Sequence, residues 1–476
     1  MDPRVESGST KHGAGRAKPS KRKSPLPIAA LIAIVLCFAG AVALTASDDP
    51  EPSNAQPQAT APIVTRPPTL SNVSLTFDSG TAAQMTQART VIKYGLHGTF
   101  FINSGFVGAD GYMSRNDLQE LANAGQEIGG HTVTLADLSV VGADEAKRQV
   151  CDDRVNLNEW GFKVSSFSYP FGKVTPEAQK IVMECGYNSA RSTGTVLGKF
   201  GCDGCAAAET VIPQDVFATR ATANIDGRWS LADLQAAVTD SEATGSWLQL
   251  VFGVTEDSPD KQPINAEVFE AFCAWLGDRT AHGTSVRTVH EMIGKKAGAV
   301  VAGPVKAPAP PGVNALQNPD LETPGAWNLP QCWQSSSYGK NTPWFSKLAP
   351  APTGSTGANL QVTDYESGDA KVLPTLDLGE CAPSVIVGHT YTLGASLTST
   401  ERTQIELYVR DKVGKWTYWT ASPYYPAGVD PIRYSWVTPP VPEGAVALSF
   451  GFNLFSNGVI VTDDYTMYDT TGEIAQ

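Results

Sequence analysis

Between residues 71 and 297, short apolar runs alternate with longer segments whose apolar residues recur every three or four positions. The short runs predict strands, and the periodic segments predict helices. Strands that alternate with helices favour parallel pairing in an α/β barrel or layered sheet, with chemistry at the carboxyl ends of the strands. The predicted strands are Val73–Phe77, Gly98–Ile102, Phe167–Tyr169, Trp247–Phe252 and Ser285–Val289, and the predicted helices are Ala82–Tyr94, Arg115–Ala124, Ala143–Trp160, Thr175–Cys185, Leu231–Thr244 and Asn265–Arg279.

The helical period disappears after a Pro/Ala/Gly/Val-rich stretch at residues 298–313, which is typical of a linker. Residues 314–476 carry short alternating stretches such as "TYTLGASL", "QIELYVRD" and "VALSFGFNL", separated by Gly, Pro and Asp. This pattern predicts an all-β sandwich. The expected fold is therefore an α/β domain at residues 71–297 followed by an all-β domain.

The chain begins with a basic tail, residues 1–25, in which seven Lys and Arg face two acidic residues. Residues 26–45 include the nineteen uncharged residues Leu26–Leu44, enough to span a bilayer core. We expect a single-pass anchor with a cytoplasmic N-terminus and an extracellular bulk. A cleaved signal peptide is the alternative, because "ALTAS" offers small residues near a cleavage point. Residues 46–70, rich in Pro, Ala, Thr and Gln, predict a flexible linker.

Charge and cysteine content narrow the partners and the environment. A net charge of −13 argues against nucleic acid. Seven cysteines lie outside the apolar segment, and in an oxidising compartment disulfides are the default. Cys202 and Cys205 form a lone CxxC, for which zinc is a weak alternative. The odd count leaves one thiol, and Cys273 in an apolar helical pattern is the best candidate for it.

The first domain carries "LTFDSG", "HGTFFINSG", "GQEIGGHTVTLADLS", "SFSYPFG", "GYNSARSTG" and "WLQLVFG" in this order. These motifs over residues 71–297 resemble the polysaccharide deacetylases with a NodB-homology domain. The resemblance implies a distorted (β/α) barrel and a divalent metal, commonly zinc. It also implies removal of acetyl groups from N-acetylated sugars such as chitin or peptidoglycan. In that chemistry the metal activates water and a carboxylate takes its proton.

The resemblance assigns site roles residue by residue. Asp78 takes the position of the catalytic base, and His131 that of one metal ligand. Ser79 and Leu135 stand where the family has a ligand Asp and a ligand His, and Gly253 stands where it has the acid His. Because a catalytic zinc needs about three protein ligands, we expect the metal to be absent or weakly bound.

Other positions in the barrel carry expectations of binding or structure. Ser168 stands where many members of the family have an arginine that orients the base. Tyr169, Pro170 and Phe171 are expected to form a sugar-stacking wall, or else simply to pack. Arg191 points into the groove or pairs with an acid elsewhere. Cys151 and Cys185 are expected to bridge two barrel helices.

The ends of the second domain, "LQNPDLETPG" and "VTDDYTMYD", resemble the opening and closing strands of jelly-roll carbohydrate-binding modules. The resemblance implies a structural calcium, for which Asp320, Glu322 and Asp463 are the candidate ligands. Cys332 and Cys381 are the disulfide expected in this domain. The segment "KWTYWTASPYY" is dense in rings, so Trp416 and Trp419 are expected to stack on sugars, unless half of these rings fill the core.

The predicted function is that of a membrane-anchored, degenerate polysaccharide deacetylase-like protein that binds cell-wall or extracellular polysaccharide. The first alternative is an active deacetylase that hydrolyses the amide C–N bond of N-acetylated sugars. The second is a non-catalytic interaction module in cell-wall assembly.

Overall fold

The computed structural model describes residues 70–253, 262–325, 329–348, 351–354 and 356–471. The predicted membrane anchor at residues 26–45 lies outside these ranges. Within them, no helix is both long enough and apolar enough to cross a bilayer. This finding corrects the predicted single-pass topology, and with it the cytoplasmic N-terminus and the extracellular bulk.

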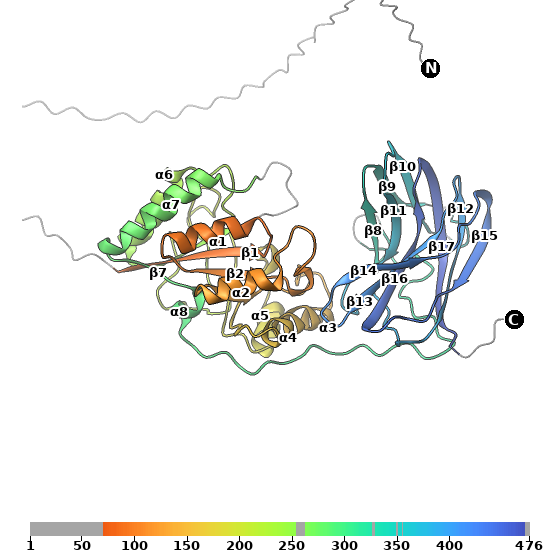
Figure 1. Cartoon of the computed structure of the whole chain (residues 1–476), viewed down its shortest axis with the longest axis horizontal. Coiled ribbons are helices and arrows are strands. Elements are labelled where there is room, and N and C mark those ends of the chain that lie inside the picture. The colour runs from red at the N-terminus through yellow and green to blue at the C-terminus, as the bar shows by residue number, and fades with distance from the viewer. Residues whose placement is uncertain (1–69, 254–261, 326–328, 349–350, 355, 472–476) are drawn as a thin grey trace, which may run out of the picture. The chain divides into compact units, whose positions relative to one another are not determined.

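The first domain is built on a seven-stranded, entirely parallel sheet in the order β5-β4-β3-β2-β1-β6, with β7 also paired to β1 (Figure 1). Parallel pairing sends every carboxyl strand end to one edge. The predicted α/β barrel-type domain is confirmed. The strands are β1 Ser71–Ser79, β2 Gly98–Ile102, β3 Glu127–Gly130, β4 Ser166–Ser168, β5 Ser189–Arg191, β6 Trp247–Phe252 and β7 Thr284–Val286.

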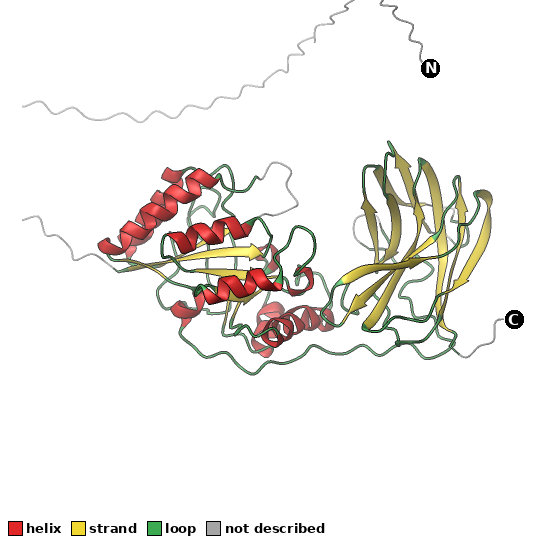
Figure 2. Ribbon diagram, in the orientation of Figure 1, coloured by secondary structure: helices red, strands yellow, loops and turns green. Residues whose placement is uncertain are grey.

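Helices surround these strands (Figure 2), and several begin at side-chain caps. Ser114 forms a capping box with Asp117, Ser230 forms one with Asp233, and the Thr175 side chain accepts from the Ala178 backbone. Such caps satisfy amide groups that the first helical turn leaves unpaired. The helices are α1 Gln84–Lys93, α2 Arg115–Asn123, α3 Ala143–Lys147, α4 Asp153–Glu159, α5 Pro176–Glu184, α6 Leu231–Thr244, α7 Ala266–Arg279 and α8 Val289–Ile293, with a π-helical segment, Arg148–Asp152, between α3 and α4.

The second domain consists of two five-stranded antiparallel sheets, in the orders β15-β12-β17-β10-β9 and β14-β13-β16-β11-β8. Their inner faces share one apolar core, which includes Leu393, Leu407, Phe450 and Met467. The predicted all-β sandwich is confirmed. The strands are β8 Trp333–Tyr338, β9 Thr342–Leu348, β10 Gly357–Thr363, β11 Asp369–Pro374, β12 Tyr391–Ser399, β13 Ile405–Asp411, β14 Trp416–Ala421, β15 Gly428–Val437, β16 Ala445–Leu454 and β17 Gly458–Asp469.

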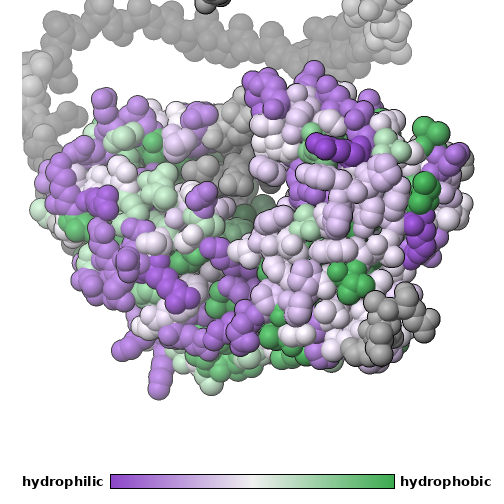
Figure 3. All heavy atoms as spheres, turned by 45° about the vertical axis from the view of Figure 1, so that its right-hand side comes forward, coloured by the Kyte–Doolittle hydropathy of each residue, from purple (hydrophilic) through white to green (hydrophobic). Residues whose placement is uncertain are grey.

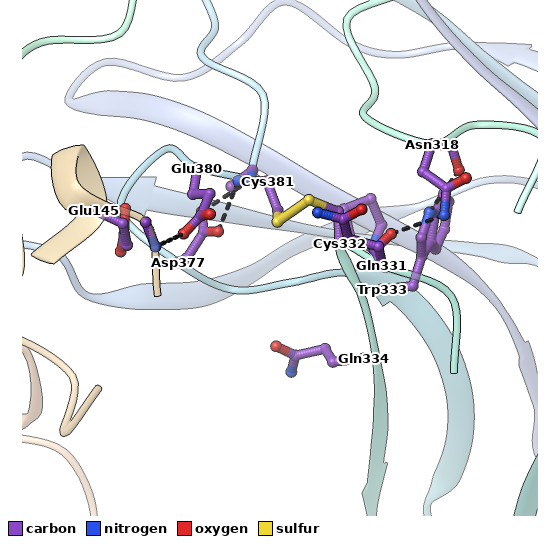
Figure 4. The surroundings of a disulfide bond; sticks show 12 residues. Glu145, Asn318, Gln331, Cys332, Trp333, Gln334, Asp377, Glu380 and Cys381 are labelled. Carbon is purple, nitrogen blue, oxygen red and sulfur yellow. Dashed lines mark hydrogen bonds between the residues drawn. A yellow bond between two sulfur atoms is a disulfide. The ribbon is translucent and has the colours of Figure 1, made fainter. Parts of the chain in front are cut away.

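Three disulfides form among the described cysteines, and both predicted pairs are among them: Cys151–Cys185 in the barrel and Cys332–Cys381 in the sandwich. Cys202 and Cys205 pair with each other. Cys273 is a buried free thiol, as expected, and its burial raises the pKa to about 12. Figure 4 shows Cys332–Cys381 joining the start of β8 to the loop after β11.

That same loop is held by buried acids. Asp377 accepts backbone hydrogen bonds from Cys381 and Ala382 at 2.7 and 2.9 Å. Glu145, at the start of α3, accepts one from Leu378 at 2.8 Å, and Figure 4 places it beside this loop. Burial and the neighbouring Glu145 raise the pKa of Asp377 to about 6. Backbone amides therefore hold Asp377, whereas Glu145 also accepts a charge-assisted hydrogen bond from Arg148 Nε at 3.0 Å.

The face shown in Figure 3 is mostly polar. On this face, hydrophobic residues form separate small patches among polar ones. Scattered apolar residues of this kind are normal on a folded domain and need no partner to cover them. Recognition by this protein is therefore to be sought in clusters of polar and aromatic side chains.

Candidate functional site

The motif residues of the barrel meet at the carboxyl edge of the parallel sheet. Asp78 and Ser79 end β1, where they pair in register with Phe101 and Ile102 of β2. His131 directly follows β3, Ser168 and Arg191 end β4 and β5, and Gly253 directly follows β6. Residues spread over 176 positions of sequence are thus brought to one edge, as parallel pairing requires.

Asp78 is held by a guanidinium that is fully buried. Arg191 donates from Nη2 to Oδ1 of Asp78 and, at 2.9 Å, to Oγ of Ser168. Its Nη1 donates to the Ser192 carbonyl oxygen and to Thr193 Oγ1, both at 3.0 Å. Such charge-assisted contacts are stronger and more directional than neutral hydrogen bonds. The sequence left two possibilities for Arg191, a side chain in the groove or one paired with an acid. The structure shows it paired with Asp78, the candidate base.

The same contact explains the serine at position 168. The family resemblance implies an arginine there, on β4, to orient the base. Here the guanidinium comes from Arg191 on the neighbouring strand β5, and the small Ser168 side chain accepts a hydrogen bond from it. The orienting cation is therefore present, but on the adjacent strand.

A hydrogen bond at Nδ1 fixes the orientation of the His131 ring and leaves its Nε2 atom as an acceptor. Its Nδ1 lies 2.7 Å from the Ser168 carbonyl oxygen, so Nδ1 carries the proton and Nε2 keeps its lone pair. Burial lowers the pKa of His131, although the Asp78 charge opposes the shift. The neutral ring could accept a proton or hold one coordination position of a metal.

A buried carboxylate beneath His131 fixes the loop that carries it. Asp153 on α4 accepts from the backbone amides of Ser104 and His131 at 2.9 and 3.0 Å. Complete burial raises the pKa of Asp153 to about 7. The sequence alone does not reveal Asp153, because nothing in a helical pattern distinguishes a supporting acid from a surface one.

Four residues at this edge have left-handed backbone conformations that are uncommon for side chains other than glycine. They are Ser79 (φ 80°), Thr132 (φ 68°), Leu135 (φ 58°) and Phe171 (φ 58°). Such conformations cost about 1–3 kcal/mol each and cluster at functional sites. Ser79 and Leu135 therefore have strained backbones, although neither carries the expected ligand side chain.

Gly253 borders Asp78. A Cβ built on Gly253 would lie 3.7 Å from the Asp78 Cβ and 3.2 Å from Oδ1 of Asn224. A larger residue at this position would thus enter the site, but Asn224 would have to shift. Asn224 is a second residue that sequence analysis missed, since the stretch "TANID" around it carries no motif.

The donor set does not fit a catalytic zinc site of the family type. Three protein ligands are needed. His131 offers one imidazole, Ser79 a hydroxyl and Leu135 only carbon, while Arg191 holds one oxygen of Asp78. In the described part of the chain, no group of three or more His, Cys, Asp and Glu side chains is arranged to hold a metal ion.

The predicted sugar-stacking wall is mostly interior. Tyr169 is buried, its hydroxyl donates to the Phe217 carbonyl oxygen at 2.9 Å, and its ring packs edge-on against Phe167. Pro170 is buried as well. Phe171 is 46% exposed. The prediction is wrong for Tyr169 and Pro170, because their side chains fill the space behind the strand ends, and it stays open for Phe171.

The predicted tryptophans of the sandwich are also partly interior. Trp419 packs against the sandwich core. The Nε1 atom of Trp416 is buried and has no hydrogen-bond partner among the described residues, and the Arg410 guanidinium lies 6.0 Å from the ring centroid. These positions match the alternative that the rings of this segment serve packing.

Two of the three proposed calcium ligands converge. A Cβ built on Gly354 would lie 2.8 Å from Oε1 of Glu322 and 3.8 Å from Oδ2 of Asp463, whereas Asp320 is exposed. Asp463 is fully buried and accepts from Thr353 Oγ1 at 2.9 Å, and burial raises its pKa to about 6. Calcium at this place stays a prediction.

Comparison with known proteins supports the assignment of the first domain. Residues 65–190 match the polysaccharide deacetylase family model. The curated protein "Putative polysaccharide deacetylase YxkH" of Bacillus subtilis (strain 168) is 25% identical over 123 residues, which are 25% of this chain and 44% of that protein. The chain therefore spans less than half the length of this relative.

Two solved structures are also similar to parts of the chain. An acetyl xylan esterase of family 4 from Clostridium thermocellum, in complex with a cobalt ion, is 18% identical, with 47% of this chain and 90% of that chain covered and a TM-score of 0.33. The polysaccharide deacetylase BC0361 from Bacillus cereus is 20% identical, with 35% and 50% covered and a TM-score of 0.29. The family-model match over residues 65–190 supports the predicted polysaccharide deacetylase domain, while a carbohydrate-binding identity for the second domain stays a prediction.

Proposed function

We propose that this protein binds glycan through a polysaccharide deacetylase domain that has lost the family's metal-dependent chemistry. One observation carries the proposal: the three positions beside Asp78 and His131 that should supply two metal ligands and the acid carry Ser79, Leu135 and Gly253. A hydroxyl, an alkyl chain and a hydrogen atom cannot polarise a carbonyl, hold a metal firmly or protonate a leaving amine.

The rival function is deacetylation at an unusual site. It is favoured by the Asp78–Arg191 pair and by the orientation of His131, both of which are suited to acid–base work. Metal analysis separates the two. We expect the purified chain to retain no stoichiometric zinc after dialysis. One zinc per chain that is lost in His131→Ala would establish the rival function instead.

The proposed loss of metal-dependent chemistry can also be tested by restoring the missing metal ligands. The double variant Ser79→Asp with Leu135→His should bind zinc, because the backbone at both positions already has the strained geometry of the site. Its hydrolysis of N-acetylated oligosaccharides should stay poor until Gly253→His is added, since the leaving amine otherwise lacks an acid. A folded double variant that remains metal-free would show that the edge has diverged beyond the ligand positions.

Glycan binding itself is tested by pull-down of the full chain with insoluble chitin and with peptidoglycan. Stacking contacts keep most of their strength at high salt, whereas charge-driven adsorption is screened. We expect retention in both low and high salt. Absence of binding to every glycan would favour the third function, a protein-interaction module in cell-wall assembly.

A further inference from the structure

The sandwich carries a charged cluster on the outer face of the sheet β14-β13-β16-β11-β8. Along β13, Ile405 and Leu407 face the core, while Glu406 and Tyr408 alternate to the other face. On the other strands the same outer face carries Asp369 and Lys371 of β11 and Asn453 of β16, with Lys371 and Asn453 paired in register.

These side chains form one network. Lys371 Nζ donates to Asp369 Oδ1 at 2.6 Å and to the Tyr408 hydroxyl at 3.0 Å, and it lies 2.9 Å from Glu406 Oε2. Asn453 Nδ2 donates to Glu406 Oε1 at 2.8 Å. Lys371, Asp369 and Glu406 are all at most 9% exposed. The acceptors and donors satisfy one another, but the charges do not cancel.

Two carboxylates face one ammonium, so the network carries one excess negative charge when all three groups are ionised. Burial and the neighbouring Glu406 raise the pKa of the Asp369 carboxyl to about 6. Buried charge without full compensation is costly. A cation placed over this face would remove that cost, whereas a neutral ligand would not.

Exposed tyrosines stand on both sides of the network. Tyr338 on β8 is in register with Asp369 and is 67% exposed. Tyr418 on β14 is in register with Tyr408, packs edge-on to its ring with centroids 6.0 Å apart, and is 56% exposed. A network that served only folding would not need two large rings held in solvent beside it.

The space between the two rings suits a short chain of sugars. β14 and β8 are four strand spacings apart, about 19 Å. The middle strand, β16, carries Gly451, whose lack of a side chain lets the β11 backbone at Val372 pack closely against it. Tyrosine rings stack on sugar faces and also attract cations through their π-electrons.

We propose that this tyrosine face, made by Tyr338, Tyr418, Lys371, Asp369 and Glu406, binds an oligosaccharide that bears free, protonated amino groups. The rings of Tyr338 and Tyr418 stack on the sugars, and an ammonium group lies over the negative network. The choice of a glycan rests on the proposed function, and the preference for an amine rests on the charge of the network alone. The ligand is therefore a de-N-acetylated amino sugar.

The test compares two oligomers of equal length, one of glucosamine and one of N-acetylglucosamine, by calorimetric titration of the full chain at a pH where the amine is protonated. We expect the glucosamine oligomer to bind about tenfold more tightly, the effect of a charge-assisted contact. High salt should narrow this difference. Tyr338→Ala with Tyr418→Ala should abolish binding of the glucosamine oligomer.

Trp344→Ala is the matched control, because this ring is 57% exposed but lies on β9 of the other sheet, and binding should be unchanged. Equal affinity for the two oligomers, or wild-type affinity in the double tyrosine variant, would overturn the inference. If glucosamine oligomers fail to bind while acetylated glycan is still retained in the pull-down, this inference fails and the proposed function stands. If neither binds, both fail.

Discussion

The barrel and the sandwich each contain a fully buried cation in contact with a carboxylate, Arg191 and Lys371, and the two cations meet different surroundings. Arg191 faces a single carboxylate, Asp78, so the pair is neutral overall. Lys371 faces two, Asp369 and Glu406. The barrel pair lies at strand ends beside strained residues, whereas the sandwich network lies within its strands, between exposed tyrosines.

This difference indicates what each region can still do. In the barrel the candidate base is neutralised by Arg191, and among the residues that the structure describes no group of three His, Cys, Asp or Glu side chains could hold a metal ion. The site therefore offers hydrogen bonds and shape to a neutral sugar. In the sandwich the excess charge favours a cation. The barrel site would then recognise the acetylated form of the glycan, and the tyrosine face would recognise its de-N-acetylated form.

The largest expected effect comes from breaking the neutral pair. Arg191→Met leaves Asp78 buried without its counter-charge and should lower the free energy of unfolding by about 3–5 kcal/mol, measured by urea denaturation. Arg89→Met is the control, because its ion pair with Glu120 is largely exposed and should be worth at most about 1 kcal/mol. Equal losses in the two variants would show that the barrel pair is not held in a low-dielectric interior.

The disulfides give the next largest effect. Cys332→Ser with Cys381→Ser opens a loop with a sequence separation of 49 and should destabilise the sandwich by about 2–5 kcal/mol. Cys202→Ser with Cys205→Ser opens a loop with a separation of only three and should cost less, because a short loop loses little entropy when it is closed. Finding Cys332 and Cys381 as free thiols by mass spectrometry would remove the basis of this prediction.

A smaller effect appears in the pH dependence of stability. The folded pKa of Asp369 is about 6, against an ordinary value of 3.8. Between these values the folded chain holds a proton that the unfolded chain has released, so this group stabilises folding as pH falls and loses that effect as pH rises through 6. Asp369→Asn removes the linkage. Relative to wild type, the variant should be more stable at pH 7 than at pH 4, by at most about 3 kcal/mol.

Asp233 should affect the pH dependence of stability in the opposite direction to Asp369. Lys199 and the backbone of Ser230 lower its pKa to about 2, so its stabilising effect is lost only as pH falls below about 4. Asp233→Asn should therefore change stability relative to wild type in the other direction and in a lower pH range. Parallel pH profiles for the two variants would contradict the opposite pKa shifts of Asp369 and Asp233.

The sequence predicted β1, β2, β4 and β6 but missed β3 and β5, and it did not predict the contacts between strands. The bounds of β2, β6 and α6 follow directly from the apolar pattern. The strand β3 was missed because "EIGG" has two glycines, and β5 because it has only three residues. Ser285–Val289 was predicted as one strand, but α8 begins at Val289 behind a Thr288 cap.

The sequence did not predict which residues contact one another across strands. Asp78 and Arg191 are 113 residues apart, and no periodicity links them. Alternation along β11 and β13 shows that Lys371 and Glu406 leave the core, but only the strand order brings them together around β16. Tyr169 and Tyr418 illustrate the same limit: both follow a polar–aromatic pattern, yet one ring is buried and the other exposed because of what packs over it.

The smallest expected effect is the sharpest test of the comparison between the two regions. Phe171 in the barrel and Tyr418 in the sandwich are both about half exposed, and each should contribute roughly 1 kcal/mol if it stacks on a sugar, about a fivefold change in affinity. If the neutral barrel site binds acetylated sugar and the tyrosine face binds the amine, Phe171→Ala should weaken only the N-acetylglucosamine oligomer. Tyr418→Ala should weaken mainly the glucosamine oligomer. Because each variant is the control for the other, a loss for the same oligomer in both would mean that one continuous surface, rather than two sites of different charge, recognises the glycan.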